Sequence, residues 1–383
     1  MLGLLAALST LTIAMYIPGF HQMANDFKVS ENQIAFTLTS YFIGITVGQL
    51  IYGPIIDKYG RKNPLLISLC IFIVSSIGCS LANSLNILIL LRFIQAIGAS
   101  AGMVSALAII TDVFEPAERP KAFSLVMTVL GVAPIVSPSL GSFFVAAYNW
   151  EAVFYAITVY GAVVVFLIFM FLPETARYAS PEKLRIKQVL ANYGSVLKNK
   201  IFSLHAIGGS MANAVIFAFV AASPAIFMGF YKVTPKEFGL LYGISATGAM
   251  MGNYLNGVLV EKIHSRKMMM AGALSLFALT SAVALITYFA DGFPYQAMVV
   301  TLFFILLCVG LIYPNTINAA LSPFKELAGS ASALNGSLMM AMSALITAII
   351  GALSTSSPFT MFAIMVAASA LVLVFLQMAK QRQ

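Results

Sequence analysis

Charged residues are scarce in this sequence. Asp, Glu, Lys and Arg make up 9% of its 383 residues, whereas about a quarter of the residues in a soluble domain are charged. Hydrophobic residues make up 60% of the chain, and the mean hydropathy is +0.95. Because so few polar residues cannot cover a water-exposed surface, the composition excludes an ordinary soluble protein and indicates one embedded in a lipid bilayer.

Residues that carry most enzyme chemistry are also scarce. The three cysteines all fall within apolar stretches, and an odd number placed in this way gives no disulfide framework. The three histidines are scattered at loops or at the ends of apolar stretches: His21, His205 and His264. An active site needs catalytic groups that converge on one face, and a channel needs a ring of residues lining a pore. Because neither is visible, we expect no enzyme, no metal and no other cofactor.

Long apolar stretches recur along the whole chain. Each has roughly 20 residues, enough for a helix to cross ~30 Å of hydrocarbon. Twelve can be counted, at about 2–21, 33–55, 64–82, 86–111, 121–147, 151–172, 201–228, 237–261, 268–289, 294–315, 328–352 and 357–378. Since they occupy most of the chain, the sequence predicts an all-α membrane protein with twelve transmembrane helices and no soluble domain.

Lys and Arg are distributed unevenly between alternate loops. Of the 21 cations, 17 fall on one set of loops and on the carboxyl end, whereas the opposite loops hold Lys28, Lys232 and Lys236. Cytoplasmic loops carry an excess of Lys and Arg, so we expect both termini in the cytoplasm and a multi-pass protein of a bacterial inner membrane. The net charge of +8 then reflects topology, and we expect no nucleic-acid partner.

The polar segment 173–200 divides six predicted spans from six others. We therefore expect an N-terminal six-helix bundle at 1–172, a cytoplasmic linker at 173–200 and a C-terminal six-helix bundle at 201–383. We also expect the protein to act as a monomer.

A short pattern is repeated in the two halves. Gly53–Lys58 (Gly-x-x-x-Asp-Lys) recurs as Gly257–Lys262 (Gly-x-x-x-Glu-Lys), in each case between the second and third span of its half. Transporters built from parallel repeats bind substrate between the halves, near the membrane midplane. The repeat therefore favours two pseudo-symmetric bundles that form a transporter.

The first copy of this pattern supplies five gating candidates: Gly53, Asp57, Gly60, Arg61 and Lys62. The glycines allow close helix approach and a turn, and the acid can cap a helix or pair with a cation. The stretch resembles the loop between the second and third helices of the major facilitator superfamily, G-x-x-x-D-x-x-G-R-K/R. The resemblance implies the major facilitator fold and a gate that holds the cytoplasmic side shut.

Arg92 and Gln95 are coupling candidates in the fourth predicted span. A cation within a span is costly and usually functional, and a spacing of three places both side chains on one helical face. The alternative is an arginine that extends to the membrane surface. The stretch resembles the superfamily's R-x-x-Q-G motif, with Ala96 where glycine is usual. In drug antiporters the resemblance associates this arginine with proton coupling.

Pro134, Pro138 and Gly141 are gating candidates in the fifth predicted span. Proline removes helix hydrogen bonds and small residues permit close contact, although packing alone also accounts for them. The stretch resembles the antiporter motif G-x-x-x-G-P-x-x-G-G, with Ser137 and Ser142 in two glycine positions. This motif separates exporters from importers.

Further stretches, Ala222–Pro224 and Gly329–Gly336 among them, resemble the bicyclomycin/chloramphenicol-resistance subfamily of drug:H⁺ antiporters. That subfamily usually carries an aspartate in its first helix, and Ala14 stands in this position. Proton coupling then needs another acid, and we expect Asp112 or Glu151 to titrate at the edge of the cavity. Two alternatives remain open: Arg92 anchors an anionic substrate, or transport is uncoupled.

Without a deep carboxylate, the cavity should prefer neutral, amphipathic or anionic cargo. The expected lining residues are apolar, aromatic or amide side chains at mid-span depth: Met15, Tyr16, Asn213, Phe217, Tyr313, Asn315 and Asn335. We expect a secondary active exporter of small amphipathic molecules, a multidrug-type antiporter driven by the proton gradient through alternating access. The alternative is a dedicated exporter of an endogenous metabolite, siderophore or sugar, without proton coupling.

Overall fold

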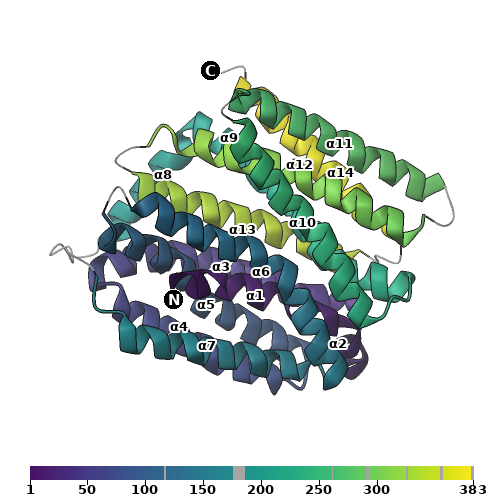
Figure 1. The fold of residues 1–383 in the computed structure, drawn as a ribbon, viewed down its shortest axis with the longest axis horizontal. Coiled ribbons are helices and arrows are strands. Elements are labelled where there is room, and N and C mark those ends of the chain that lie inside the picture. The colour runs from purple at the N-terminus through teal and green to yellow at the C-terminus, as the bar shows by residue number, and fades with distance from the viewer. Residues whose placement is uncertain are drawn as a thin grey trace.

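The structure is a computed structural model that describes residues 1–115, 118–175, 186–260, 262–289, 293–324, 327–353 and 357–380. Helices make up nearly all of these residues, and no β-strand occurs among them. The predicted all-α fold is therefore confirmed (Figure 1).

The first half of the chain forms one broken and five continuous long helices. In chain order, the elements are α1 (Leu2–Ala14), η1 (Ile17–Gly19), α2 (Phe20–Phe27), α3 (Glu31–Tyr59), α4 (Lys62–Ser80), α5 (Leu85–Val113), α6 (Arg119–Ala147) and α7 (Glu151–Phe171). α1, the short 3₁₀ turn η1 and α2 together make the first span, Leu2–Phe27. This span extends beyond its predicted end at about residue 21, because the chain continues as helix after the turn at Pro18.

The second half begins with a short helix and then repeats the pattern of long helices. Its elements are α8 (Ile186–Lys198), α9 (Lys200–Pro224), η2 (Ala225–Phe230), α10 (Pro235–Leu259), α11 (Ser265–Phe289), α12 (Tyr295–Leu321), α13 (Ala328–Ala352) and α14 (Pro358–Lys380). η2 is a π-helical turn that continues α9.

α10 differs from the other long helices in hydropathy. Eleven spans in the described chain are long and apolar enough to cross a membrane, and α10, at the predicted span 237–261, is not among them. Its Gly239 and Gly243 face α6, whereas Gly248 and Gly252 lie against the backbone of α12. Glycine permits such close helix contact but adds little hydropathy. With α10 packed in this way, the described residues form the twelve long helices of the predicted fold.

The long helices form two bundles that meet along two seams. In the first bundle α5 packs against α1, α3 and α4, while α7 packs against α4 and α6 against α1. In the second, α9 packs against α12, α13 and α14, while α11 packs against α12 and α14. α3 contacts α13 and α6 contacts α10 across the bundles. Figure 1 shows the purple-to-blue and green-to-yellow groups lying side by side.

Candidate functional site

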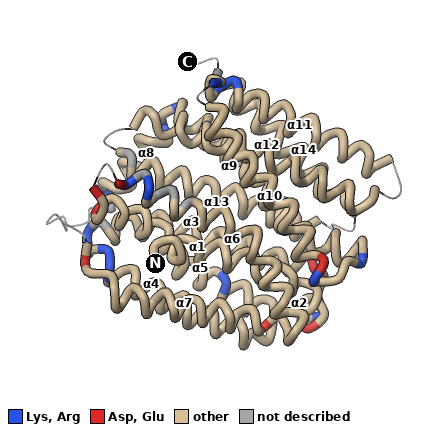
Figure 2. Tube along the Cα trace, viewed as in Figure 1, with Lys and Arg blue, Asp and Glu red and all other residues tan. Residues whose placement is uncertain are grey.

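Charged residues gather at the two ends of the bundles, and few lie between them (Figure 2). At one end Arg61 Nε lies 2.9 Å from Asp112 Oδ2. At the other, His21 Nδ1 lies 2.7 Å from Glu31 Oε1. We call these the Arg61 end and the His21 end. Arg92 lies apart from both clusters.

Arg92 lies on α5 in the interior of the first bundle, with a side chain that is 0% exposed. Its Nη1 donates to Gln95 Oε1 at 2.6 Å, and Gln95 Nε2 donates to Ser76 Oγ on α4 at 2.7 Å. Nη1 and Nη2 each lie 3.4 Å from the carbonyl oxygen of Thr12 on α1. Arg92 and Gln95 thus share one face, as their spacing predicts, and join α5 to two neighbouring helices.

Three aromatic rings surround the Arg92 guanidinium. Its Cζ lies 4.1 Å from the ring centroid of Tyr16, 4.2 Å from that of Tyr41 and 5.8 Å from that of Phe154. Aromatic faces attract cations, most strongly where water is excluded. An arginine that extends to the membrane surface keeps its charged tip in water, so this burial contradicts the surface alternative for Arg92.

Arg92 has no carboxylate partner among the residues that the structure describes. Asp112 lies near the end of α5 and Glu151 at the start of α7, at opposite ends of the bundle. One oxygen of Glu151, Oε2, is buried without a hydrogen-bond partner. The structure therefore brings two of the four coupling candidates together, Arg92 and Gln95, and leaves both acids apart from them.

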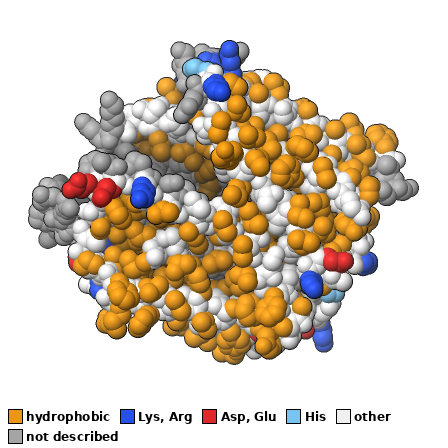
Figure 3. Space-filling model, in the orientation of Figure 1, with side chains coloured by type: hydrophobic (Ala, Val, Ile, Leu, Met, Phe, Trp, Pro, Cys, Tyr) orange, Lys and Arg blue, Asp and Glu red, His pale blue; other side chains and the backbone are white. Residues whose placement is uncertain are grey.

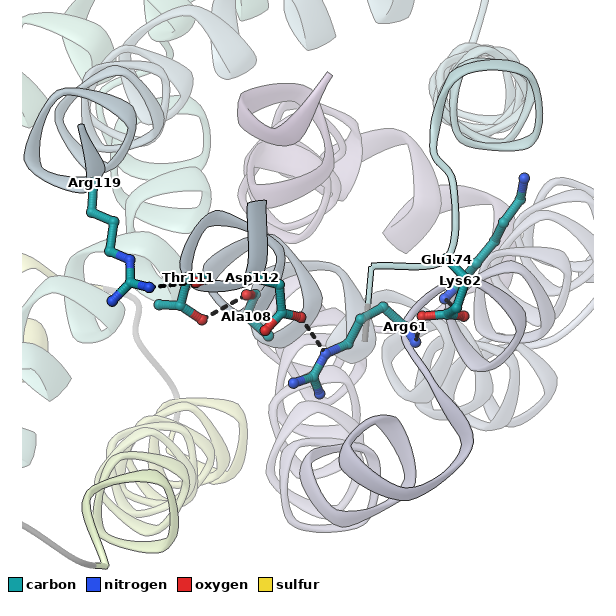
Figure 4. Close-up of polar contacts among 7 residues, drawn as sticks. All are labelled: Arg61, Lys62, Ala108, Thr111, Asp112, Arg119 and Glu174. Carbon is teal, nitrogen blue, oxygen red and sulfur yellow. Dashed lines mark hydrogen bonds and ion pairs between the residues drawn. The ribbon is translucent and has the colours of Figure 1, made fainter. Parts of the chain in front are cut away.

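At the Arg61 end, the loop between α3 and α4 is held by two carboxylates (Figure 4). Arg61 Nε donates to Asp112 Oδ2 at 2.9 Å. The backbone N–H groups of Arg61 and Lys62 donate to Glu174 Oε1 and Oε2 at 2.8 Å and 3.1 Å. These N–H groups lie at the start of α4, so Glu174 caps that helix. Its negative charge also interacts favourably with the partial positive charge at the helix N-terminus. Asp112, a coupling candidate, contacts the predicted gate, and its role in coupling stays a prediction.

The turn itself depends on Gly60, which has a φ of +88°. A Cβ there would lie 2.6 Å from Glu174 Oε2. Gly53, in contrast, faces open space. Lys62 Nζ donates to the carbonyl oxygen of Phe169 at 3.1 Å, which ties the loop to α7. The side chain of the remaining gating candidate, Asp57, lies outside the described residues, as does Glu261 of the second copy.

The proline-containing part of α6 lies between the two bundles. A Cβ at Gly141 would overlap the carbonyl of Met15 after α1, so only glycine permits this close approach. On its other side, Ser139 Oγ donates to the Gly239 carbonyl of α10 at 3.3 Å. A Cβ at Gly239 would lie 3.1 Å from the Pro138 carbonyl. Pro134 and Pro138 both lie inside the helix, and their stretch forms a seam between the bundles.

The α6–α10 seam closes at the His21 end and opens at the Arg61 end. A Cβ at Gly243 would lie 3.1 Å from the carbonyl of Ile135, whereas Gly131 and Gly257, nearer the Arg61 end, face open space. Figure 3 shows the surface hollowed between the bundles toward that end, with hydrophobic side chains in the hollow. The two bundles thus enclose a space that is open on one side.

A family model described as Major Facilitator Superfamily matches residues 2–347. The chain belongs to the major facilitator superfamily. An uncharacterized MFS-type transporter of Bacillus subtilis, YdgK, is 32% identical over 359 residues, which cover 93% of this chain and 89% of the relative. A bicyclomycin resistance protein homolog of Haemophilus influenzae is 30% identical and covers 95% and 92% of the two chains. Multidrug resistance protein D of Escherichia coli is 27% identical and covers 88% and 84%.

Solved structures share the fold at low sequence identity. A bacterial homolog of the human lysosomal transporter Spinster, in an inward-facing and occupied conformation, matches with a TM-score of 0.77 and 17% identity, over 99% of this chain and 95% of that one. A D-xylose-proton symporter matches with a TM-score of 0.77 and 16% identity, over 98% and 95%. The predicted major facilitator fold is confirmed.

In this superfamily member, several expected lining residues already have protein partners. Tyr16 Oη lies 3.0 Å from Thr37 Oγ1 inside the first bundle, and Tyr313 Oη lies 2.6 Å from Met339 Sδ. Asn315 Nδ2 donates to Asn256 Oδ1, so this pair joins α12 to α10. The amide of Asn315 therefore has a polar partner within the protein. Its role in substrate binding stays a prediction.

Of the remaining lining candidates, Phe217 lies at the boundary between the bundles. Phe217 on α9 packs against Phe42 on α3, with ring centroids 4.5 Å apart. Asn213 is half-buried, whereas Met15 and Asn335 are buried. Of these residues, Phe217 has the clearest position for contact with a molecule between the bundles.

Sequence reasoning missed three residues around the two arginines: Tyr41, Phe154 and Glu174. The two aromatic residues lie on other helices than Arg92, and no short motif connects them to it. Glu174 follows the sixth span in a Pro-Glu-Thr sequence. An acid just beyond the end of a span is the signal that could have pointed to it.

Proposed function

We propose that this chain is a multidrug-type exporter of small amphipathic molecules that exchanges them for protons. The hollow between the bundles carries the proposal: α6 and α10 meet at the His21 end and separate at the Arg61 end. An arrangement with one closed and one open side is what alternating access needs. The relatives named as bicyclomycin and multidrug resistance proteins support drug cargo.

The Arg61 end faces the cytoplasm in this proposal, with both termini on that side of a bacterial inner membrane. Its excess of Lys and Arg supports this orientation. The hollow then opens inward, where an exporter collects its cargo. The division into bundles at 1–172 and 201–383, joined by the linker 173–200, is part of the same proposal, because these are the units that would rock against each other.

Proton coupling is assigned to Arg92, Gln95, Asp112 and Glu151. Asp112 contacts Arg61, so a change in its protonation would reach the gating loop. One oxygen of Glu151 is buried without a hydrogen-bond partner among the described residues, which supports its place among the coupling residues. The cargo contacts Phe217, Asn213 and their neighbours between the bundles. The protein works as a monomer, without nucleic acid, on small-molecule substrates in the bilayer.

Transport by proteoliposomes tests the proposal. Radiolabelled chloramphenicol, a neutral amphipathic drug, is supplied under a pH gradient of either sign to wild type, Arg92→Ala and Arg92→Lys. Wild type should move the drug faster when protons flow in the opposite direction. Arg92→Ala should lose this acceleration, whereas Arg92→Lys, which keeps the charge, should retain part of it.

Two results would contradict the proposal. If wild-type transport ignores the sign of the gradient, proton antiport is wrong. If no drug moves but a metabolite, siderophore or sugar does, the chain is a dedicated exporter.

A further inference from the structure

Arg92 is a full positive charge inside the first bundle, and its described surroundings are neutral. They consist of the Thr12 carbonyl, the Gln95 amide and the aromatic rings of Tyr16, Tyr41 and Phe154. A cation inside a membrane protein is costly, and it is normally paired with an acid or with backbone carbonyls. Aromatic faces and one carbonyl recover only part of the cost of burial.

The N–H donors of Arg92 also make few short hydrogen bonds. Only the bond from Nη1 to Gln95 is short, at 2.6 Å, while Nη1 and Nη2 share the Thr12 carbonyl at 3.4 Å. Nε is buried and has no hydrogen-bond partner in the part of the chain that the structure describes. A guanidinium carries five N–H donors in a fork that matches a carboxylate, which accepts two of them side by side. The unused donors of Arg92 therefore match an anion with two oxygen atoms, and the described residues around it supply none.

Ala14 lies in the sequence between two residues that contact the guanidinium, and it carries a methyl group instead of an anion. Ala14 lies between Thr12, whose carbonyl contacts the guanidinium, and Tyr16, whose ring lies on it. It is buried, at 3% exposed. An acid at this position would give Arg92 a permanent partner, and alanine leaves the partner to come from elsewhere.

We propose that the carboxylate of the transported molecule is this partner, so that Arg92 binds the anionic group of an amphipathic monoanion. The inference rests on the proposed export function and names the class of cargo. The rings of Tyr16, Tyr41 and Phe154 suit an aromatic or apolar body attached to the carboxylate. A neutral molecule has no group that satisfies the guanidinium, so it binds more weakly.

The proposal requires that the cargo reach Arg92 when the bundles move. Tyr16 lies between α1 and η1, and η1 contacts α9 and α10 of the second bundle. The segment that carries Tyr16, one of the rings over the guanidinium, is therefore in contact with the part of the protein that would move. In the conformation described here, Arg92 is fully enclosed.

Calorimetric titration of the purified full-length protein in detergent tests the subsite. The probes are 1-naphthylacetate and 1-naphthylacetamide, which share one ring and differ in a carboxylate or a neutral amide. Wild type should bind the carboxylate about 10- to 100-fold more tightly, the range expected for hydrogen bonds to a charged group. Arg92→Gln should lose this preference and keep its affinity for the amide.

A second pair of variants leaves Arg92 in place. Ala14→Asp supplies an internal carboxylate and should abolish the preference for the anionic probe. Ala14→Asn adds nearly the same volume without charge and should retain it. Fluorescence of the single tryptophan, Trp150, reports the fold of each variant, because its ring packs 6.0 Å from that of Phe154.

Equal affinity of wild type for the two probes would overturn the proposal, and so would failure of the carboxylate to bind. Retention of the preference in Arg92→Gln, or equal preference in Ala14→Asp and Ala14→Asn, would overturn it as well. None of these results bears on drug export. Failure to transport chloramphenicol contradicts the proposed function and leaves the comparison of the probes intact.

Discussion

Arg61 and Arg92 are two arginines of the same bundle with opposite surroundings. Arg61 lies at the bundle end, pairs with Asp112 at 2.9 Å, and the two side chains are 13% and 18% exposed. Arg92 is 0% exposed, and aromatic rings and amides take the place of an acid. An ion pair near water holds a loop at small cost, since both charges remain partly hydrated. A buried cation without an acid depends on its whole environment.

The largest difference between the two sites should come from removing an aromatic ring at Arg92. Tyr41→Ala or Phe154→Ala should destabilise the protein by about 3–5 kcal/mol, the usual cost of truncating a large buried ring. About 2 kcal/mol of this should be the lost attraction between ring and cation. Thermal unfolding in detergent measures the total loss of stability.

A double-mutant cycle separates the two contributions. In an Arg92→Met background, Tyr41→Ala should cost less, because no charge remains to be stabilised. Phe72→Ala serves as the matched control, since Phe72 is fully buried and contacts Gly161 of α7 in the same bundle. Equal costs of Tyr41→Ala in both backgrounds would show that the rings contribute packing alone.

The two sites also differ in how far the sequence predicts them. The spacing of Arg92 and Gln95 predicts their contact, because residues three apart share a helix face. The glycine at position 60 predicts the tight turn. Tyr41 and Phe154 could not be predicted, because helix packing brings them to Arg92 from distant parts of the chain. Helix packing also explains the low hydropathy of α10, because its glycines contact α6 and α12 rather than lipid.

An intermediate effect is expected at Gly60 in the loop at the Arg61 end, for which Gly257, on α10, is the matched control. Gly60→Ala should destabilise the loop by about 1–3 kcal/mol, because its φ of +88° is available almost only to glycine. The added Cβ would also lie 2.6 Å from Glu174 Oε2 and disturb the cap of α4. Gly257→Ala, within α10 and facing open space, should instead stabilise the protein by about 0.5–1 kcal/mol.

Opposite signs in thermal unfolding would support this difference between the two glycines. Hydrogen exchange at the backbone N–H groups of Arg61 and Lys62 should increase in Gly60→Ala only. If both substitutions destabilise equally, backbone conformation is not what requires glycine at position 60.

The smallest effect on stability is expected at the ion pair itself. Asp112→Asn should cost about 1 kcal/mol or less, because Arg61 and Asp112 are both partly exposed and the amide still accepts a hydrogen bond. Arg61→Gln removes the same pair, and the double variant measures how much of each single cost belongs to the pair itself. At Arg92, in contrast, removing a neighbouring aromatic ring should cost more stability than removing the cation. Unfolding of these three variants and of Arg92→Met in low and high salt checks this contrast: salt should weaken the Arg61 pair and leave the buried Arg92 site unchanged. A salt-dependent stability at Arg92 would mean that water reaches the guanidinium, and the contrast between the two arginines would then fail.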